Sequence, residues 1–163
     1  MTPTDADQRR KRIHFERKTI NAAESAKRDE FKHGEITEKV IGVFFAVYNE
    51  LGYGFIESVY HKAMLIALAD AGLTVETQAS LPVFFRGHLV GDFRADILVE
   101  RVVILELKAT SDFAAANESQ LLNYLKASAV EVGLLLNFGP KPKFKRFAFD
   151  NERKRSRPAI EFS

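Results

Sequence analysis

The sequence of 163 residues contains no cysteine and no tryptophan. The absence of cysteine excludes disulfide bonds, thiolate metal sites and cysteine nucleophiles. Nine glycines and five prolines are too few for a collagen-like chain, and 46% hydrophobic with 28% charged residues is typical of a globular domain. No apolar run approaches the roughly 20 residues that a membrane-spanning helix needs. Because the N-terminal sequence is polar and lacks the apolar segment of a signal peptide, we expect a cytoplasmic protein with no membrane partner.

Positive charge is scarce in the middle of the chain. Lys and Arg outnumber Asp and Glu by nine to seven in residues 1–35 and by four to two in residues 151–163, whereas residues 36–150 hold eleven against thirteen. A protein that binds a polyanion through charge alone has a stronger basic bias. If residues 36–150 bind nucleic acid, we therefore expect a local basic strip or bound cations.

Three segments of different composition predict the domain organisation. Residues 1–33 are rich in charge and poor in large apolar side chains, which predicts a solvated, partly helical or disordered extension. A basic arm that contacts phosphates is the alternative for this segment. Residues 34–150 carry regular apolar patterns and are expected to form one packed domain, followed by a basic tail over residues 151–163.

Apolar residues at helical spacing predict three helices in the packed domain. They cover residues 36–51, 57–71 and 113–128. Gly52 and Gly72 are expected to end the first two, and Ser111 or Asp112 to cap the third. The second helix is expected to turn its apolar side chains toward the core: Val59, Ala63, Leu65, Ile66 and Leu68.

Alternating and β-branched segments predict six strands. They are residues 73–78, 81–86, 89–99, 102–108, 132–138 and 144–149. Two helices, four strands, one helix and two strands in this order predict an α/β fold with a central mixed sheet flanked by helices.

Three charged residues interrupt the two most apolar strands. Asp96 lies in the strand that ends at Val99, and Glu106 and Lys108 lie in the next one. An unpaired charge in a buried strand costs several kcal/mol, so three of them need a common explanation. A divalent cation supplies one, because two carboxylates offer the oxygen ligands that Mg²⁺ binds at about 2.0–2.1 Å.

This explanation predicts the register of the hairpin between the two strands. Side chains alternate along a strand, so Glu106 and Lys108 share a face. Asp96 joins them if the connecting loop has three residues, 100–102, or a shorter turn with a bulge. A plain two-residue turn would send Asp96 to the opposite face. With the correct register, Lys108 reaches the same cavity and could orient a water or offset transition-state charge, as phosphodiester hydrolysis requires.

These residues resemble those of the PD-(D/E)XK nuclease superfamily, which is marked by an acidic residue followed by Glu-x-Lys on the next strand. The segment Gly54-Phe-Ile-Glu57-Ser-Val-Tyr60 resembles the signature of the bacterial GxxExxY proteins within it. The resemblance implies a restriction-endonuclease-like core and metal-dependent nuclease activity with Mg²⁺, or Mn²⁺, as cofactor. Ala95 stands where the superfamily's name has proline.

The resemblance also implies roles for residues on two helices. Glu57 corresponds to an acidic residue on the helix before the sheet, where it would be a further metal or water ligand beside Asp96 and Glu106. Gln120 and Tyr124 correspond to the Gln-x-x-x-Tyr of RecB-like nucleases and would hold the substrate backbone. Their spacing of four residues puts both on one helical face.

Each of these residues also has a simpler structural interpretation. Glu106 and Lys108 could be an exposed pair on an edge strand, and Glu57 could interact only with the dipole of its helix. Tyr60 and Tyr124 could be core aromatics, and Gln120 a surface residue. The four histidines show no metal-binding spacing, and His61 is expected at the surface. The basic and aromatic residues 141–146 could follow a phosphate backbone or form a solvated strand edge.

The combined pattern predicts a Mg²⁺-dependent nuclease that acts on nucleic acid, with DNA expected before RNA. Two alternatives remain open. One is a non-catalytic nucleic-acid-binding or protein-interaction module that keeps the nuclease fold. The other is a phosphohydrolase that uses the same site on small nucleotides. Because the domain holds little beyond its core, we also expect a homodimer or a protein partner.

Overall fold

The computed structural model describes residues 8–10, 12, 16–17, 19 and 32–154. The chain divides into two units, residues 1–32 and 33–163. In the first unit, described residues between 8 and 19 are helical, and Arg12 donates a hydrogen bond to Glu16 at 3.0 Å. Much of the predicted extension, and the predicted tail beyond residue 154, lie outside the described residues. No helix in the described ranges is long and apolar enough to span a membrane.

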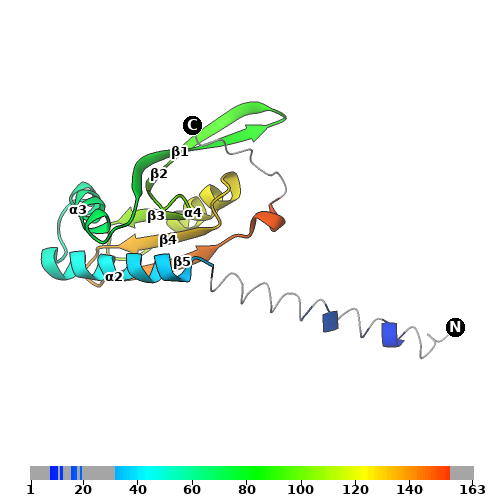
Figure 1. The fold of residues 1–163 in the computed structure, drawn as a ribbon, viewed down its shortest axis with the longest axis horizontal. Helices are drawn as coiled ribbons and strands as arrows, with labels where there is room; N and C mark the ends of the chain where they lie inside the picture. Colours follow the sequence, from blue (N-terminus) through cyan, green and yellow to red (C-terminus); the bar gives the residue numbers. More distant parts are fainter. Residues whose placement is uncertain (1–7, 11, 13–15, 18, 20–31, 155–163) are drawn as a thin grey trace. The chain divides into compact units, whose positions relative to one another are not determined.

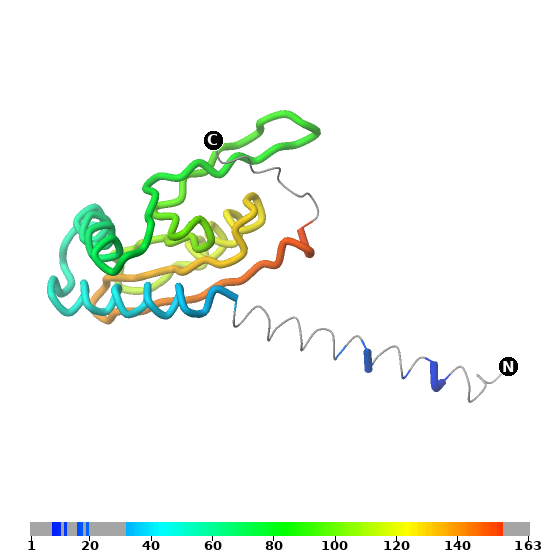
Figure 2. The backbone as a smooth tube through the Cα atoms, in the orientation of Figure 1, coloured from blue at the N-terminus to red at the C-terminus, as the bar shows by residue number. Residues whose placement is uncertain are grey.

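The second unit is built around a five-stranded mixed sheet (Figures 1 and 2). The strands follow one another in the order β1-β2-β3-β4-β5: Val75–Phe85, His88–Val99, Val103–Lys108, Val132–Asn137 and Lys143–Ala148. Strands β3 and β4 pair in parallel, and the other neighbouring pairs are antiparallel. In the described part of this unit, three α-helices accompany the sheet, α2 (Gly34–Leu51), α3 (Glu57–Asp70) and α4 (Ala115–Ala127), and a short 3₁₀ helix (Asn151–Arg153) follows β5. The predicted mixed sheet flanked by helices is confirmed.

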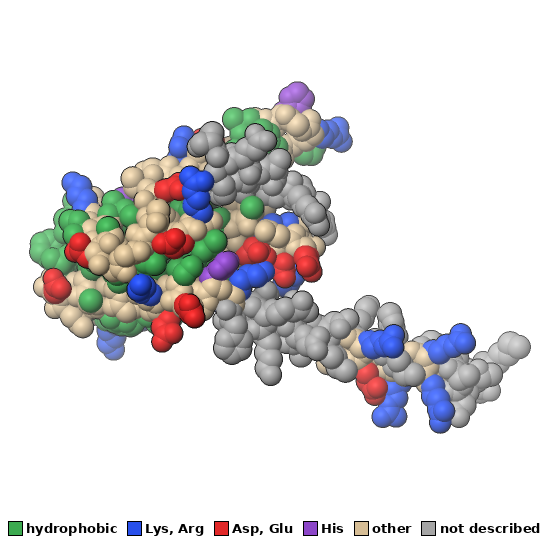
Figure 3. Space-filling model, viewed as in Figure 1, with side chains coloured by type: hydrophobic (Ala, Val, Ile, Leu, Met, Phe, Trp, Pro, Cys, Tyr) green, Lys and Arg blue, Asp and Glu red, His purple; other side chains and the backbone are tan. Residues whose placement is uncertain are grey.

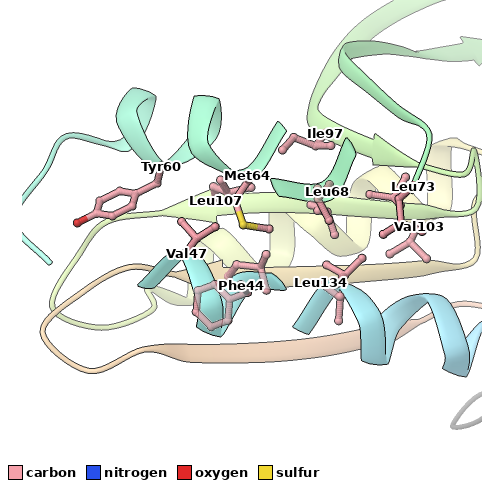
Figure 4. Close-up of a cluster of buried hydrophobic side chains, with 14 of the residues drawn as sticks. Phe44, Val47, Tyr60, Met64, Leu68, Leu73, Ile97, Val103, Leu107 and Leu134 are labelled. Atoms are coloured by element: carbon pink, nitrogen blue, oxygen red, sulfur yellow. The ribbon is translucent and has the colours of Figure 1, made fainter. Parts of the chain in front are cut away.

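Alternation along β3 separates two hydrophobic clusters, one on each face of the sheet. Val103, Leu105 and Leu107 pack against α2 and α3, as Figure 4 shows for part of this cluster. Ile104 points to the other face, where it packs with side chains of α4. Glu106 and Lys108 follow Ile104 at steps of two, so the strand directs both toward the α4 face.

Both predicted ends of the first two helices agree with the structure to within a residue or two. Gly52 ends α2 with a φ of 67°, a left-handed conformation that favours glycine. The predicted buried face of α3 is partly wrong. Its buried residues are Tyr60, Met64 and Leu68, and Ile66 is 65% exposed. Because α3 carries apolar residues on nearly every side, spacing alone does not identify the face that meets the sheet.

The prediction of six strands is wrong by one, because residues 73–78 and 81–86 belong to a single strand, β1. The strand continues through Pro82. Proline is tolerated there because β1 lies at the edge of the sheet, where one side of the backbone has no strand to pair with. The third helix begins at Ala115 with Ala114 as its N-cap residue, so neither Ser111 nor Asp112 caps it.

The end of β4 is fastened to the loop that follows β3. The Asn137 side chain accepts a hydrogen bond from the Thr110 backbone N–H at 3.0 Å and donates one to the Thr110 carbonyl at 2.9 Å. Gly139 lies so close that an added Cβ would come within 1.9 Å of the Thr110 carbonyl oxygen. This contact holds the chain directly after Lys108 in place.

We expect Gly139→Ala to lower the free energy of unfolding by at least about 2 kcal/mol, because the backbone must move to admit the methyl group. Gly42→Ala is the matched control, since Gly42 lies within α2 with nothing within 4 Å of its added Cβ. That change should stabilise the protein by about 0.5–1 kcal/mol. Urea denaturation measures both, and equal effects would contradict the close approach at Gly139.

Candidate active site

The hairpin between β2 and β3 has the register that the metal hypothesis predicted. Val99 pairs with Val103, so the connecting loop has the three residues 100–102. Glu100 and Arg101 in this loop have positive φ angles of 50° and 58°. The alternative two-residue turn is therefore excluded.

Asp96 lies on β2 directly beyond the point where the backbone pairing of β2 with β3 ends. The ladder between the two strands ends at the pair Ile97–Leu105. One residue further, the Asp96 carboxylate replaces the strand as a hydrogen-bond partner, because its Oδ2 accepts the Leu107 backbone N–H at 2.9 Å. The side chain therefore lies against β3 next to Glu106, as the register requires.

Glu106 is a buried carboxyl on the central strand. It is 3% exposed, and within the described part of the chain its Oε2 has no hydrogen-bond partner. Burial raises its pKa from 4.5 to about 8, and the neighbouring Asp96 adds to the rise. Lys108 and a hydrogen bond from the Asp96 backbone lower the pKa only in part. The interpretation of Glu106 as an exposed edge residue is wrong, since β3 lies in the middle of the sheet.

Lys108 and Glu57 border this carboxyl pair. Lys108 is half-buried at the end of β3, and Glu57 is exposed as the first residue of α3. Partial burial raises the pKa of Glu57, Lys108 opposes the rise, and Asp96 adds to it. The four predicted residues, Glu57, Asp96, Glu106 and Lys108, are thus close enough to act on one another electrostatically.

His61 belongs to this neighbourhood, so of the two positions considered for it, at the surface or near the site, the structure favours the second. It is half-buried, and its Nε2 is 3.0 Å from the Asp96 backbone oxygen and 3.2 Å from Thr77 Oγ1. Its position four residues after Glu57 puts it on the same helical face, but its contact with Asp96 has no local signal in the sequence.

The Gly54–Tyr60 segment consists of the loop before α3 and the first turn of that helix, which begins at Glu57. Gly54 has a φ of 111°, which residues with a side chain rarely adopt. Tyr60 is fully buried, and its hydroxyl donates a hydrogen bond to the Gly52 carbonyl at 2.7 Å and accepts one from the Phe55 N–H at 3.3 Å. The interpretation of Tyr60 as a core aromatic fits these contacts, and its hydroxyl also ties the loop to α3.

Gln120 and Tyr124 face the sheet from α4. Gln120 Nε2 donates a hydrogen bond to the Tyr124 hydroxyl at 2.6 Å. Partial burial raises the pKa of Tyr124, and the nearby charges of Glu106 and Asp96 raise it further, which places the phenol on the same side as the two carboxyls. Tyr124 also packs in the α4 cluster, so both the core and the site interpretations apply to it.

The side chains of the site fit a divalent cation, although they are not gathered into a finished metal centre. In the described ranges, no three His, Asp or Glu side chains lie together as a metal-binding group. The fit lies in the donor set: Glu106 Oε2 is a buried oxygen without a partner in the described chain, and the Asp96 carboxylate is beside it. Hard oxygen donors of this kind suit Mg²⁺ or Mn²⁺.

The basic residues near the chain's C-terminal end form a strand edge. Of the basic and aromatic residues 141–146, residues 143–146 lie on β5, the outer strand of the sheet. Lys143 donates to Asp112 at 3.1 Å, and Lys145 is paired with Glu118. Both lysines therefore form ion pairs with acidic residues of the neighbouring loop and helix. Because their charges are already paired, the strand-edge interpretation is favoured over binding of a phosphate backbone.

Comparison with known proteins gives one family match and distant structural likenesses. A family model described as the PD-(D/E)XK nuclease superfamily matches residues 34–147. The chain resembles the crystal structure of SSO0001 at 20% identity and a TM-score of 0.46, over 76% of this chain and 62% of that one. It resembles Hjc, a Holliday junction resolvase of Archaeoglobus fulgidus, at 17% identity and a TM-score of 0.37, over 56% of this chain and 71% of that one. A search of curated proteins gave no match.

Proposed function

We propose that this chain, which belongs to the PD-(D/E)XK nuclease superfamily, is a metal-dependent nuclease that hydrolyses phosphodiester bonds in nucleic acid. The observation that carries the proposal is the buried Glu106, which has an oxygen without a partner in the described chain, on the central strand beside Asp96. A buried carboxyl without a partner lowers the stability of a protein. A cation bound to Glu106 would supply the missing partner and so explain why this position holds a glutamate.

In this proposal Asp96, Glu106 and Glu57 hold Mg²⁺ or Mn²⁺. When bound, the ion supplies Lewis-acid polarisation of the phosphoryl group. Glu106 and Asp96 provide the oxygens on β3 and β2, and Glu57 borders them from the start of α3. His61 is a positioning residue, because its contact with the Asp96 backbone oxygen fixes the strand where β2 leaves β3.

Lys108 acts on the substrate. Its position two residues after Glu106, at the end of β3, places an ammonium group at the rim of the carboxyl pair. There it orients the attacking water and offsets the negative charge of the transition state. Gln120 and Tyr124, joined by their hydrogen bond, offer a hydroxyl and an amide that hold the substrate backbone from the α4 side.

The finer assignments also belong to the proposal. Within this proposal the chain is one of the bacterial GxxExxY proteins, which Gly54, Glu57 and Tyr60 support as matches to the motif. The contacts of these residues give the motif a physical role in shaping the loop before α3. We expect DNA as the preferred substrate, a cytoplasmic location and association as a homodimer or with a protein partner. The domain limits remain a charged extension over residues 1–33, the nuclease domain over 34–150 and a basic tail over 151–163.

A metal-dependent cleavage screen with Asp96→Asn tests the proposal. The wild-type protein should cut plasmid DNA, single-stranded DNA or RNA with Mg²⁺ or Mn²⁺ and lose activity in EDTA. Asp96→Asn should lower the rate at least about 100-fold, because it removes a metal-binding charge while keeping an oxygen for the Leu107 N–H.

Asp70→Asn is the control, since Asp70 is exposed at the end of α3. Inactivity of the wild-type protein with every substrate and both metals would favour the non-catalytic module. Activity on small nucleotides alone would favour the phosphohydrolase. Equal rates for Asp96→Asn and wild type would contradict the assignment of the site.

A further inference from the structure

The hairpin of β1 and β2 extends well beyond the sheet that it starts from (Figures 1 and 2). Pairing of β2 with β3 ends at Ile97, whereas pairing of β1 with β2 continues from Ala79–Ala95 to Phe85–His88. Residues 79–95 are here called the arm. In the part of the chain that the structure describes, the two strands of the arm pair with each other and with no third strand. Gln78, with a φ of 52°, lies where the arm begins, opposite Asp96.

The base of the arm is packed, and its end is not. Leu81 and Ala95 are buried in the α4 cluster, and the ring of Phe93 lies 5.4 Å from that of Tyr124. Beyond these contacts the large apolar side chains are exposed: Phe84 by 51%, Phe85 by 59%, Leu89 by 60% and Val90 by 61%. A two-stranded hairpin is marginally stable in water, so an end covered with bare apolar side chains indicates a surface that binds something.

The side chains at the end of the arm combine aromatic rings with positive charge. The Arg86 guanidinium lies 5.0 Å from the centre of the Phe85 ring, and His88 pairs across the strand with Phe85. The single acidic residue of the arm, Asp92, is nearer its base and is already paired with Arg94 at 3.0 Å. Figure 3 shows hydrophobic, basic and histidine side chains gathered at the end of the β1–β2 hairpin, at the top of the view.

The aromatic side chains of the arm extend from Tyr124, at the candidate site, to Phe85 near the end of the arm. Phe93 pairs with Leu81, and Phe85 follows Leu81 by four residues on β1. The register shift between Val83 and Phe84 leaves its extra residue on β2, so alternation along β1 still places Phe85 on the face of Leu81 and Phe93. Phe93 contacts Tyr124, whose phenol is next to Glu106 and Asp96. Phe85 is four residue steps from Leu81, which corresponds to about 13 Å along the strand.

We propose that the arm binds nucleic acid with unpaired bases, which stack on its aromatic rings while Arg86 contacts the phosphates. Aromatic side chains and guanidinium groups together bind single strands, because every base has a face that stacks on a ring. A second copy of this chain is the competing occupant. Asp92 is paired with Arg94, so Arg86 is the charge of the arm that no acid of the arm offsets, and two copies would bring like charges together. The inference rests on the proposed function in one respect only, namely that the bound nucleic-acid strand continues from the arm to the candidate active site.

Single-tryptophan variants test the arm directly, because the natural sequence has no tryptophan. With the full chain in EDTA, so that no strand is cut, the emission of Phe85→Trp should be quenched by single-stranded DNA and much less by a blunt duplex. Ile66→Trp is the control, since Ile66 is as exposed but lies on α3, away from the arm. Its emission should not change.

Affinity measurements give a second readout. Phe85→Ala should weaken binding of labelled single-stranded DNA about tenfold, and Phe85→Tyr should restore most of it. The side chain at this position is exposed, so thermal unfolding should show unchanged stability for both variants. Unaltered emission of the Phe85→Trp protein with DNA, or unaltered affinity of Phe85→Ala, overturns the proposal.

Three further outcomes distinguish binding by the arm from dimerisation and from nuclease activity. Emission of Phe85→Trp that shifts with protein concentration alone, together with a dimer that Phe85→Ala dissociates, would assign the arm to a second copy and overturn the proposal. Quenching by single-stranded DNA in a protein that cuts nothing with Mg²⁺ or Mn²⁺ would support the arm and reject the nuclease activity. Cleavage with no effect of Phe85→Ala on affinity would do the reverse.

Discussion

Lys108→Ala is expected to lower the metal-dependent cleavage rate by about 10²–10³-fold while leaving metal and nucleic-acid binding intact. The reason is the position of the ammonium group, which lies at the end of β3 beside two carboxyls but is not itself a metal ligand. The lost interaction is made with the reacting phosphate and water rather than with the bound substrate. Single-turnover cleavage rates and DNA affinity in EDTA measure the two effects separately.

Lys62→Ala provides the matched control, because Lys62 is an exposed lysine of α3. It should cleave at the wild-type rate. A Lys108→Ala protein that also cleaves at the wild-type rate would show that Lys108 merely reduces repulsion between Glu106 and Asp96. A rate loss explained wholly by weaker DNA binding would likewise contradict the catalytic role.

Glu106→Gln is expected to abolish cleavage and, at the same time, to stabilise the metal-free protein increasingly as the pH rises from about 4.5 to about 8. The carboxyl has a pKa of about 8 in the folded protein against an ordinary value of 4.5. As pH rises from about 4.5 to about 8, the unfolded chain releases a proton that the folded chain keeps, so the free energy of unfolding falls. Glutamine carries no such proton and avoids the loss.

The difference in unfolding free energy between Glu106→Gln and wild type should grow from near zero below pH 4.5 to a few kcal/mol near pH 8. Mg²⁺ or Mn²⁺ should raise the melting temperature of the wild-type protein and have much less effect on Glu106→Gln, because the ion binds the folded state through this carboxylate. Urea titrations at several pH values and thermal unfolding with each metal measure these effects.

Glu38→Gln is the control for this prediction, since Glu38 is exposed on α2. It should follow the wild-type protein at every pH. A constant difference between Glu106→Gln and wild type from pH 4 to pH 8 would contradict the burial of an unpartnered carboxyl. Equal stabilisation of both proteins by the metal would place the cation elsewhere.

The register of the β2–β3 hairpin was predictable from the sequence because it follows from chemistry. Three charges on apolar strands can share one cation only if the loop places them on one face, and the observed pairing of Val99 with Val103 meets that condition. The mixed sheet and the order of its elements were predictable for a similar reason, since strand and helix periods are written into local spacing. The catalytic roles of Asp96, Glu106 and Lys108 remain predictions until cleavage is measured.

Contacts between distant segments were not predictable in the same way. The buried face of α3 depends on how the helix is rotated against the sheet, and α3 has apolar residues on most sides, so spacing did not exclude Ile66. The contact of His61 with the Asp96 backbone joins residues 35 positions apart and leaves no local pattern. The sequence suggested two strands where β1 is one. Only its place at the sheet edge explains why the strand can continue through Pro82.

The sequence by itself thus determined the three helices, the central strands and the charged residues that must find a partner, because local periodicity and the cost of burying charge depend on few neighbours. Only the tertiary structure decided that β2 separates from β3 at Asp96, that the Glu106 oxygen is left without a partner in the described chain, and that the arm projects with bare aromatic rings. These features arise from the packing of segments far apart in the chain, which no single stretch of sequence encodes.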